Sequence, residues 1–192
     1  MIRSLYDWTL NLASHPRALW ALAFVSFIES SVFPIPPDIM LIPMILAAPH
    51  RAWLIAGVCT VASVLGALGG YAIGALAFET LGEPVLTALG KADSFEGFTQ
   101  RYNDYGAWAV LIAGITPFPF KVITILSGTT GLSLPVFIVS SIIARGIRFF
   151  IVAALLWKFG APIRDFIEKR LGLVFTVFVV LLVGGLWGVR YL

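Results

Sequence analysis

The sequence has few charges, one cysteine and two histidines, and each scarcity excludes a class of protein. Charged residues make up 12% of the 192 residues and hydrophobic residues 59%, whereas soluble domains are roughly half apolar. Cys59 has no second cysteine for an internal disulfide, and without clustered histidines a structural zinc site is unsupported. We therefore expect a membrane protein with no metal and no cofactor.

Sequence motifs of soluble enzymes are also missing. The chain contains no G-x-S-x-G, no H-E-x-x-H and no phosphate-binding loop. Its basic residues are scattered rather than gathered into a run, which argues against a nucleic-acid partner. The N-terminus lacks an uninterrupted apolar stretch, so we expect no cleaved secretory signal. We therefore expect a protein that is not an enzyme and whose first membrane helix directs its insertion into the membrane.

Apolar and polar stretches alternate in a way that predicts one all-α membrane domain over residues 1–192. At about 20 residues for a full span, the chain has room for about five or six spanning or half-spanning elements. We expect an interfacial helix over 1–16, a first repeat over 17–78, a polar connection over 79–106, a second repeat over 107–157, and a basic loop with a final transmembrane helix over 158–192.

Two proline segments interrupt apolar stretches that otherwise resemble membrane helices. "SVFPIPPDIMLIP" contains Pro34, Pro36 and Pro37, and "TPFPFKVITILSG" contains Pro117 and Pro119. Proline removes a backbone donor and breaks helices, and broken backbone is tolerated at membrane depth only where protein or water satisfies it. The apolar returns would reach roughly 20 Å as helices, against about 30 Å of hydrocarbon. Each segment therefore predicts a re-entrant helical hairpin.

The two halves of the chain follow the same order of elements. A shift of 83 positions lays Pro34 on Pro117 and Asp38 on Lys121, and the long span of the first half then overlies that of the second. Interrupted helices at matching positions of two half-repeats are the sequence sign of a transport site at the membrane midplane.

The basic residues predict how these halves are oriented. If both proline segments turn back, seven basic residues share one side and three lie opposite. The seven are Arg3, Arg17, Arg51 and the four within 158–170, and the three are Lys91, Arg101 and Arg190. The positive-inside rule then predicts a cytoplasmic N-terminus, an external C-terminus and two repeats of inverted orientation.

Five ionisable residues fall within predicted membrane elements: Glu29 and Asp38 in the first repeat, and Lys121, Arg145 and Arg148 in the second. Each costs about 2.5 to 3.5 kcal/mol at such a depth, so each should face a cavity or a partner. One interpretation is that they only pair and hold the repeats together. Buried pairs rarely add stability beyond their desolvation cost, and these coincide with two broken helices, which favours a functional polar site.

The charge types suggest how such a site would work. With three bases against two acids, an unpaired base among Lys121, Arg145 and Arg148 could bind a lipid phosphate, which arginine recognises with fork geometry. Glu29 is the better candidate for taking up a proton during a transport cycle, because it lies mid-helix in apolar surroundings. Asp38 follows a proline near a helix start, where its charge could be stabilised as a cap.

Three glycines mark one face of the charge-free stretch 52–78. Gly66, Gly70 and Gly74 recur every four residues and predict a groove for close helix packing. The alternative is that this glycine face lines a substrate path.

Four stretches together resemble the DedA family, also called the VTT-domain or SNARE-associated Golgi protein family, and most closely its YqaA-type bacterial branch. They are "FIESSVFPIPPDIMLIP", "GALGGYAIG", "GITPFPFKVITILSGTTG" and "ARGIRFF", and the likeness covers residues 20–165. The resemblance implies a bacterial inner-membrane protein with two opposed re-entrant hairpins. Many family members carry two arginines around the second proline motif, whereas here Thr116 and Lys121 stand there and the arginines follow later.

The resemblance also implies a role in moving lipids such as undecaprenyl phosphate or a phospholipid between leaflets, often with dependence on proton or sodium gradients. The acidic pair of the family would correspond to Glu29 and Asp38. We therefore expect a lipid transporter of the flippase or scramblase kind. Such a protein could also form homo-oligomers. Two alternatives stay open: a proton- or cation-coupled transporter of ions or small molecules, and a noncatalytic membrane organiser.

Overall fold

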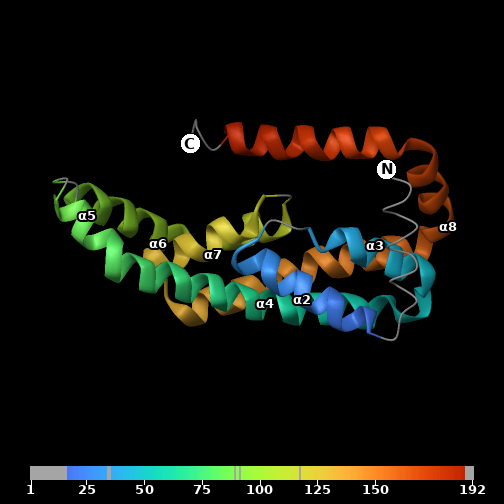
Figure 1. The fold of residues 1–192 in the computed structure, drawn as a ribbon, viewed down its shortest axis with the longest axis horizontal. Helices are drawn as coiled ribbons and strands as arrows, with labels where there is room; N and C mark the ends of the chain where they lie inside the picture. The colour runs from blue at the N-terminus through green and yellow to red at the C-terminus, as the bar shows by residue number, and fades with distance from the viewer. Residues whose placement is uncertain (1–16, 34–35, 89, 91, 117, 189–192) are drawn as a thin grey trace.

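The computed structural model describes residues 17–33, 36–88, 90, 92–116 and 118–188. The interfacial helix predicted over 1–16, and the break residues Pro34 and Pro117, lie outside the described residues. Every secondary-structure element within the described ranges is a helix, so the predicted all-α class is confirmed there (Figure 1). The α-helices are α2 (Ala18–Ser31), α3 (Asp38–Ala47), α4 (Ala52–Ala77), α5 (Glu83–Ala88), α6 (Ala92–Ile115), α7 (Phe120–Thr129) and α8 (Leu134–Gly188). A short 3-10 helix, Pro49–Arg51, precedes α4 and a π-helical turn, Phe78–Gly82, follows it.

Among the residues that the structure describes, two helical stretches are long and apolar enough to cross a membrane. They run over Pro49–Thr80, 32 residues, and Leu134–Gly160, 27 residues. At about 1.5 Å per residue both exceed the thickness of the hydrocarbon core, about 30 Å. In contrast, α2, α3 and α7 have only 14, 10 and 10 residues, so none of these three is long enough to cross alone.

Prolines set the starts of the two ten-residue helices, α3 and α7. Pro37 directly precedes α3, and Pro119 directly precedes α7. Proline fits at a helix start because its fixed φ matches the helix and the missing N–H has no intrahelical partner there. The order of helix, break, short helix and long helix consequently occurs twice, in α2–α3–α4 and in α6–α7–α8.

Helix directions bring the two breaks together near the middle of the molecule. Ser26 and Ser30 of α2 contact Cys59 and Ser63 of α4 in the same order along both helices, so α2 runs parallel to α4. The helix α7 also runs parallel to α4, because Thr124 lies beside Gly70 and Thr129, further along α7, lies beside Gly74. Figure 1 shows α3 running back in the direction opposite to α2 and lying along α8, and α7 returning beside α6 from the other end of the molecule. Whether these turns re-enter a membrane stays a prediction.

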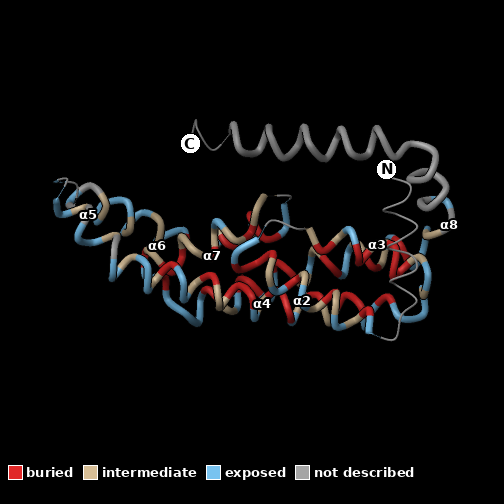
Figure 2. The backbone as a smooth tube through the Cα atoms, in the orientation of Figure 1, coloured by how far each residue is buried: buried red, intermediate tan, exposed pale blue. Residues whose placement is uncertain are grey.

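Two apolar clusters form the core on either side of a polar layer. One joins α2, α3, α4 and α8, and includes Leu22, Ile45 and Phe149. The other joins α4, α6, α7 and α8 around Phe120 and Phe137. Figure 2 shows buried residues gathered where α2, α3, α4, α7 and α8 meet, whereas α5 is mostly exposed.

The basic loop predicted over 158–170 is wrong, because the backbone stays helical throughout α8. Pro135 lies in the first turn of this helix, where proline fits, and Pro162 lies in its interior. A single interior proline kinks a helix whose other residues favour it. Figure 1 accordingly shows α8 changing direction in its second half. The boundary expected at 106/107 falls within α6, since no proline interrupts residues 92–116.

Candidate functional site: two ion pairs beside the helix breaks

A buried ion pair joins the first broken helix to the last long helix. Glu29 on α2 accepts a hydrogen bond from Arg145 on α8, with 2.5 Å between Oε2 and Nη2. The side chain of Arg145 is 1% exposed and that of Glu29 is 12% exposed. Removing two charges from water this completely requires that they pair and find further hydrogen-bond partners.

Two serine hydroxyls supply those partners. The Nε of Arg145 donates to Ser63 Oγ at 2.5 Å, Ser63 and Ser30 lie 2.6 Å apart, and Ser30 donates to Glu29 Oε2 at 3.1 Å. Because the single hydroxyl hydrogen of Ser30 points to Glu29, Ser63 is the donor in its contact with Ser30. Ser30 and Arg145 Nη2 thus donate to the Glu29 carboxylate directly, and the hydrogen bonds from Arg145 Nε through Ser63 to Ser30 add to the stabilisation of its negative charge cooperatively.

Aromatic rings enclose the guanidinium of Arg145. Its Cζ lies 4.7 Å from the ring centre of Phe120 and 4.8 Å from that of Phe149, within cation–π range. Phe120 opens α7 and Phe149 lies one turn further along α8, so both apolar clusters touch this one cation. Its Nη1 is buried without a hydrogen-bond partner among the described residues, which leaves two N–H donors for water or a bound polar group.

A second ion pair, more exposed than the first, lies at the start of α3. Asp38 Oδ2 is 2.5 Å from Arg148 Nη2, with side chains 22% and 17% exposed. Asp38 is in the first turn of α3, where the helix dipole favours a negative charge. The other arm of Arg148, Nη1, donates to the carbonyl oxygen of Thr116 just after α6, at 3.0 Å.

The third predicted base has a different partner. Lys121, in the first turn of α7, donates from Nζ to the carbonyl oxygen of Val32 at 3.2 Å. Among the described residues, the ion pairs of the site include both acids and both arginines but not this lysine. The structure therefore brings Glu29 to Arg145 and places Lys121 apart from either pair.

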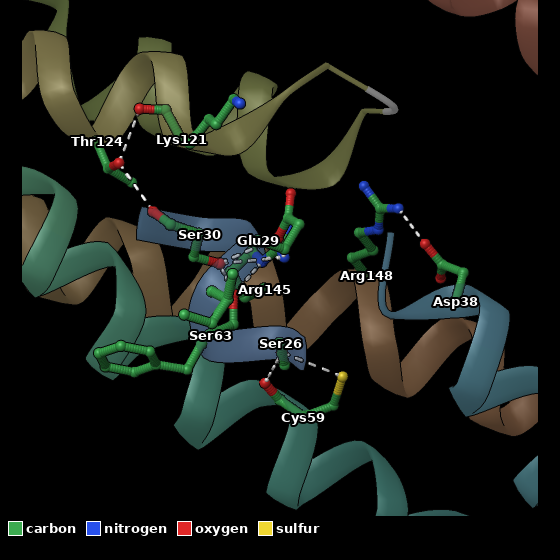
Figure 3. A network of polar contacts seen from close by, with 12 residues as sticks. Ser26, Glu29, Ser30, Asp38, Cys59, Ser63, Lys121, Thr124, Arg145 and Arg148 are labelled. Atoms are coloured by element: carbon green, nitrogen blue, oxygen red, sulfur yellow. Dashed lines mark hydrogen bonds and ion pairs between the residues drawn. The ribbon is translucent and has the colours of Figure 1, made fainter. Parts of the chain in front are cut away.

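Figure 3 shows how these side chains share one layer. Arg145 lies with Glu29, Ser30 and Ser63 at the centre, Arg148 and Asp38 lie to one side, and Lys121 extends from α7. Thr124 continues the layer, since its hydroxyl donates to the carbonyl oxygen of Ser30 at 3.0 Å.

The glycine face of α4 lets α2 and α7 approach this layer. A Cβ at Gly66 would overlap the backbone carbonyl of Phe27, and one at Gly74 would overlap that of Ile125. At Gly70 it would overlap the Thr124 hydroxyl. These glycines lie where two broken helices pack against α4, so the packing interpretation accounts for them.

Sequence reasoning missed the serines that complete the buried pair. Ser63 stands in a charge-free stretch, and its one visible signal is a polar residue on the face of α4 that also carries Gly66 and Gly70. Ser30 follows Glu29 directly. Within the part of the chain that the structure describes, no three His, Cys, Asp or Glu residues gather to hold a metal ion.

Together, the fold and this site define a helical membrane protein whose interrupted helices carry paired charges. Comparison with known proteins agrees with that class. The family model described as "VTT domain" matches residues 35–158, and the chain belongs to this family, as the resemblance to DedA proteins predicted.

Two relatives extend the likeness over most of the chain. A protein from Haemophilus influenzae is 37% identical over 169 residues, which cover 86% of this chain and 88% of that protein. One from Histophilus somni shows the same identity and coverage. Both relatives are named only as uncharacterized proteins, so neither name states an activity. No solved structure matches the chain.

Proposed function

We propose that this protein moves an anionic or phosphate-bearing lipid between the leaflets of the bacterial inner membrane. One observation carries the proposal: the two acids of the interrupted helix pair α2–α3 meet the two arginines of α8 in one polar layer that contacts both apolar clusters, with Lys121 of the second interrupted pair beside it. Charges at membrane depth are costly and usually mark a transport path. Interrupted helices at corresponding positions of two half-repeats mark the same kind of site.

In this proposal α2–α3 and α6–α7 are re-entrant hairpins of inverted orientation. Their short helices and opposite return directions support it. Each hairpin brings a helix end and a charge to the middle of the bilayer, where broken backbone needs protein or water partners. The N-terminus would be cytoplasmic under the positive-inside rule, and reporter fusions within 79–105 would then report the external side.

The residues of the layer take separate roles. Arg148 and Lys121 are the accessible cations, so they would meet the phosphate of a lipid headgroup, and Arg145 would offer its unpartnered Nη1 once the layer opens. Glu29 and Asp38 would take up protons, which would weaken their pairs with the arginines and allow the helices to move apart. Proton uptake and headgroup binding would thus be coupled through the same ion pairs.

Leaflet exchange in proteoliposomes tests this proposal. Purified protein is reconstituted with fluorescent phospholipid or polyprenyl phosphate, and exchange is followed by chemical quenching of the outer leaflet. We expect faster exchange than in protein-free liposomes, and loss of the increase in Glu29→Ala and Arg145→Ala. Lys158→Gln is a matched control, because Lys158 is an exposed cation that contacts the ring of Phe159. Unchanged exchange in both alanine variants would reject the assigned roles.

The same liposomes separate the alternatives. Proton flux without lipid exchange would favour an ion-coupled transporter, for which the buried hydroxyl ring around Glu29 would be the relevant feature. If the five charges can be replaced by apolar residues of matched size with function kept in cells, the protein is a noncatalytic organiser.

A further inference from the structure

Two helices end beside the polar layer at carbonyl groups that their own helices cannot satisfy. Val32 follows the last residue of α2, and Thr116 follows the last residue of α6. The last carbonyls of any helix lack intrahelical donors, and the negative end of the helix dipole attracts a cation there.

Each of these carbonyls receives its donor from a cation on another helix. Lys121 Nζ of α7 reaches Val32 O at 3.2 Å, and Arg148 Nη1 of α8 reaches Thr116 O at 3.0 Å. Arg148 also holds Asp38 with its second arm. Two side chains therefore connect five elements: the ends of α2 and α6, the starts of α3 and α7, and the middle of α8.

These two cations are accessible, unlike the pair beneath them. Arg148 is 17% exposed, and the contact of Lys121 with Val32 is exposed, whereas Arg145 is 1% exposed. A carbonyl oxygen is a neutral acceptor, and an anion binds the same N–H groups more strongly because the hydrogen bond is charge-assisted on both sides. An anion that reaches Lys121 or Arg148 thus competes directly with the contacts that connect the helices.

We infer that Lys121 and Arg148 form a latch that holds α2 and α3 against α6, α7 and α8 over the buried Glu29–Arg145 pair, and that an anionic headgroup releases it. This inference rests on the proposed function for its ligand, but the latch itself is independent of transport. The cations act as closing contacts in the resting protein and become binding groups for the anion only after they leave the carbonyls.

Hydrogen–deuterium exchange of the full chain in phosphatidylcholine nanodiscs tests the latch without any transported lipid. We expect Lys121→Gln and Arg148→Gln each to accelerate exchange about fivefold or more in peptides covering 28–33 and 118–124. Exchange in 56–70 of α4 should stay at the wild-type rate, and Lys158→Gln should leave all peptides unchanged. The Gln amide still has N–H donors, but it is neutral and its side chain is shorter, whereas Lys121→Arg keeps a cationic donor at full reach and should exchange like wild type.

Three results would overturn the latch. They are unchanged exchange in both glutamine variants, equal acceleration in α4, and Lys121→Arg exchanging as fast as Lys121→Gln. The anion is tested by replacing phosphatidylcholine with phosphatidylglycerol. Wild type should then exchange faster in 28–33 and 118–124, whereas Lys121→Gln should show no added effect of the lipid, and equal rates in the two lipids would contradict release by an anion. None of these exchange measurements requires lipid movement. The latch can therefore be disproved while the transport proposal stands, and the transport proposal can be disproved while the latch stands.

Discussion

Arg145 and Arg148 lie one turn apart on α8 and each pairs with one acid of the first half, yet their surroundings differ. Arg145 is 1% exposed, lies between two phenylalanine rings and shares a hydroxyl ring with its partner. Arg148 is 17% exposed, and its second hydrogen bond goes to a backbone carbonyl. Loss of a buried partner leaves a charge in an apolar site, whereas water can replace an exposed one. The inner pair should therefore govern stability, and the outer pair should govern movement.

The largest expected effect follows from removing the acid of the inner pair. Glu29→Ala leaves the Arg145 guanidinium buried without its carboxylate, which costs about 3–5 kcal/mol. We expect the apparent Tm of the detergent-solubilised protein to fall by roughly 10 °C, since about 1 kcal/mol corresponds to about 2–4 °C at this chain length. Tryptophan fluorescence during heating measures it.

A double substitution separates the lost pair from the stranded charge. Glu29→Leu with Arg145→Leu removes both charges, and replacing a whole buried pair by apolar groups is often neutral or stabilising. We expect it to recover most of the Tm lost in Glu29→Ala. A double variant as unstable as the single one would show that the stranded guanidinium is not the cause.

The next effect tests whether close helix approach builds the inner pair. Gly66→Ala forces a Cβ into the Phe27 carbonyl, so α2 must shift away from α4 at a cost of about 3 kcal/mol. Gly57→Ala on the same helix is the control, because a Cβ there meets nothing within 4 Å and alanine favours helix by about 1 kcal/mol over glycine. Comparable melting temperatures for the two variants would contradict the role given to the glycine face.

A smaller effect should come from the hydroxyl ring. Ser63→Ala leaves the Nε of Arg145 without its acceptor, and an unsatisfied buried donor costs about 1–2 kcal/mol. Thr60→Ala removes a hydroxyl on the same helix that bonds only within it, to Ala56, and should stay within about 0.5 kcal/mol of wild type. Thermal unfolding of both variants side by side checks the difference, which would vanish if Ser63 were an ordinary core residue.

Much of this arrangement could be predicted from local sequence. The prolines located both helix breaks, since proline restricts the backbone wherever it stands. The cost of buried charge identified the five ionisable residues, and all five have charged or carbonyl partners. Which acid meets which base was not predictable, because it depends on α2 running parallel to α4 and on the register of α8.

Other features depend on contacts between distant segments, which the local sequence does not reveal. Ser63 looks like any small residue of an apolar helix until α2 brings Ser30 against it. The segment 158–170 has a basic composition typical of a membrane loop, yet one proline was too little to end α8. Lys121 aligned with Asp38 under the repeat shift, but its contact with Val32 comes from the meeting of two helix ends.

The central claim is that the outer ion pair takes part in lipid movement, and lipid exchange by Asp38→Asn tests it most directly. This substitution should change lipid exchange with little change in the stability of the fold. The pair is partly open to solvent, with side chains 17% and 22% exposed, and Asn keeps the shape of Asp38 and can still bond Arg148 through its carbonyl oxygen. A loss of about 1 kcal/mol then keeps the Tm within about 4 °C of wild type. The account predicts that leaflet exchange in proteoliposomes nevertheless falls to the protein-free rate, while Lys158→Gln exchanges like wild type. Wild-type exchange by Asp38→Asn at an unchanged Tm would contradict it and leave the outer pair as a surface contact only.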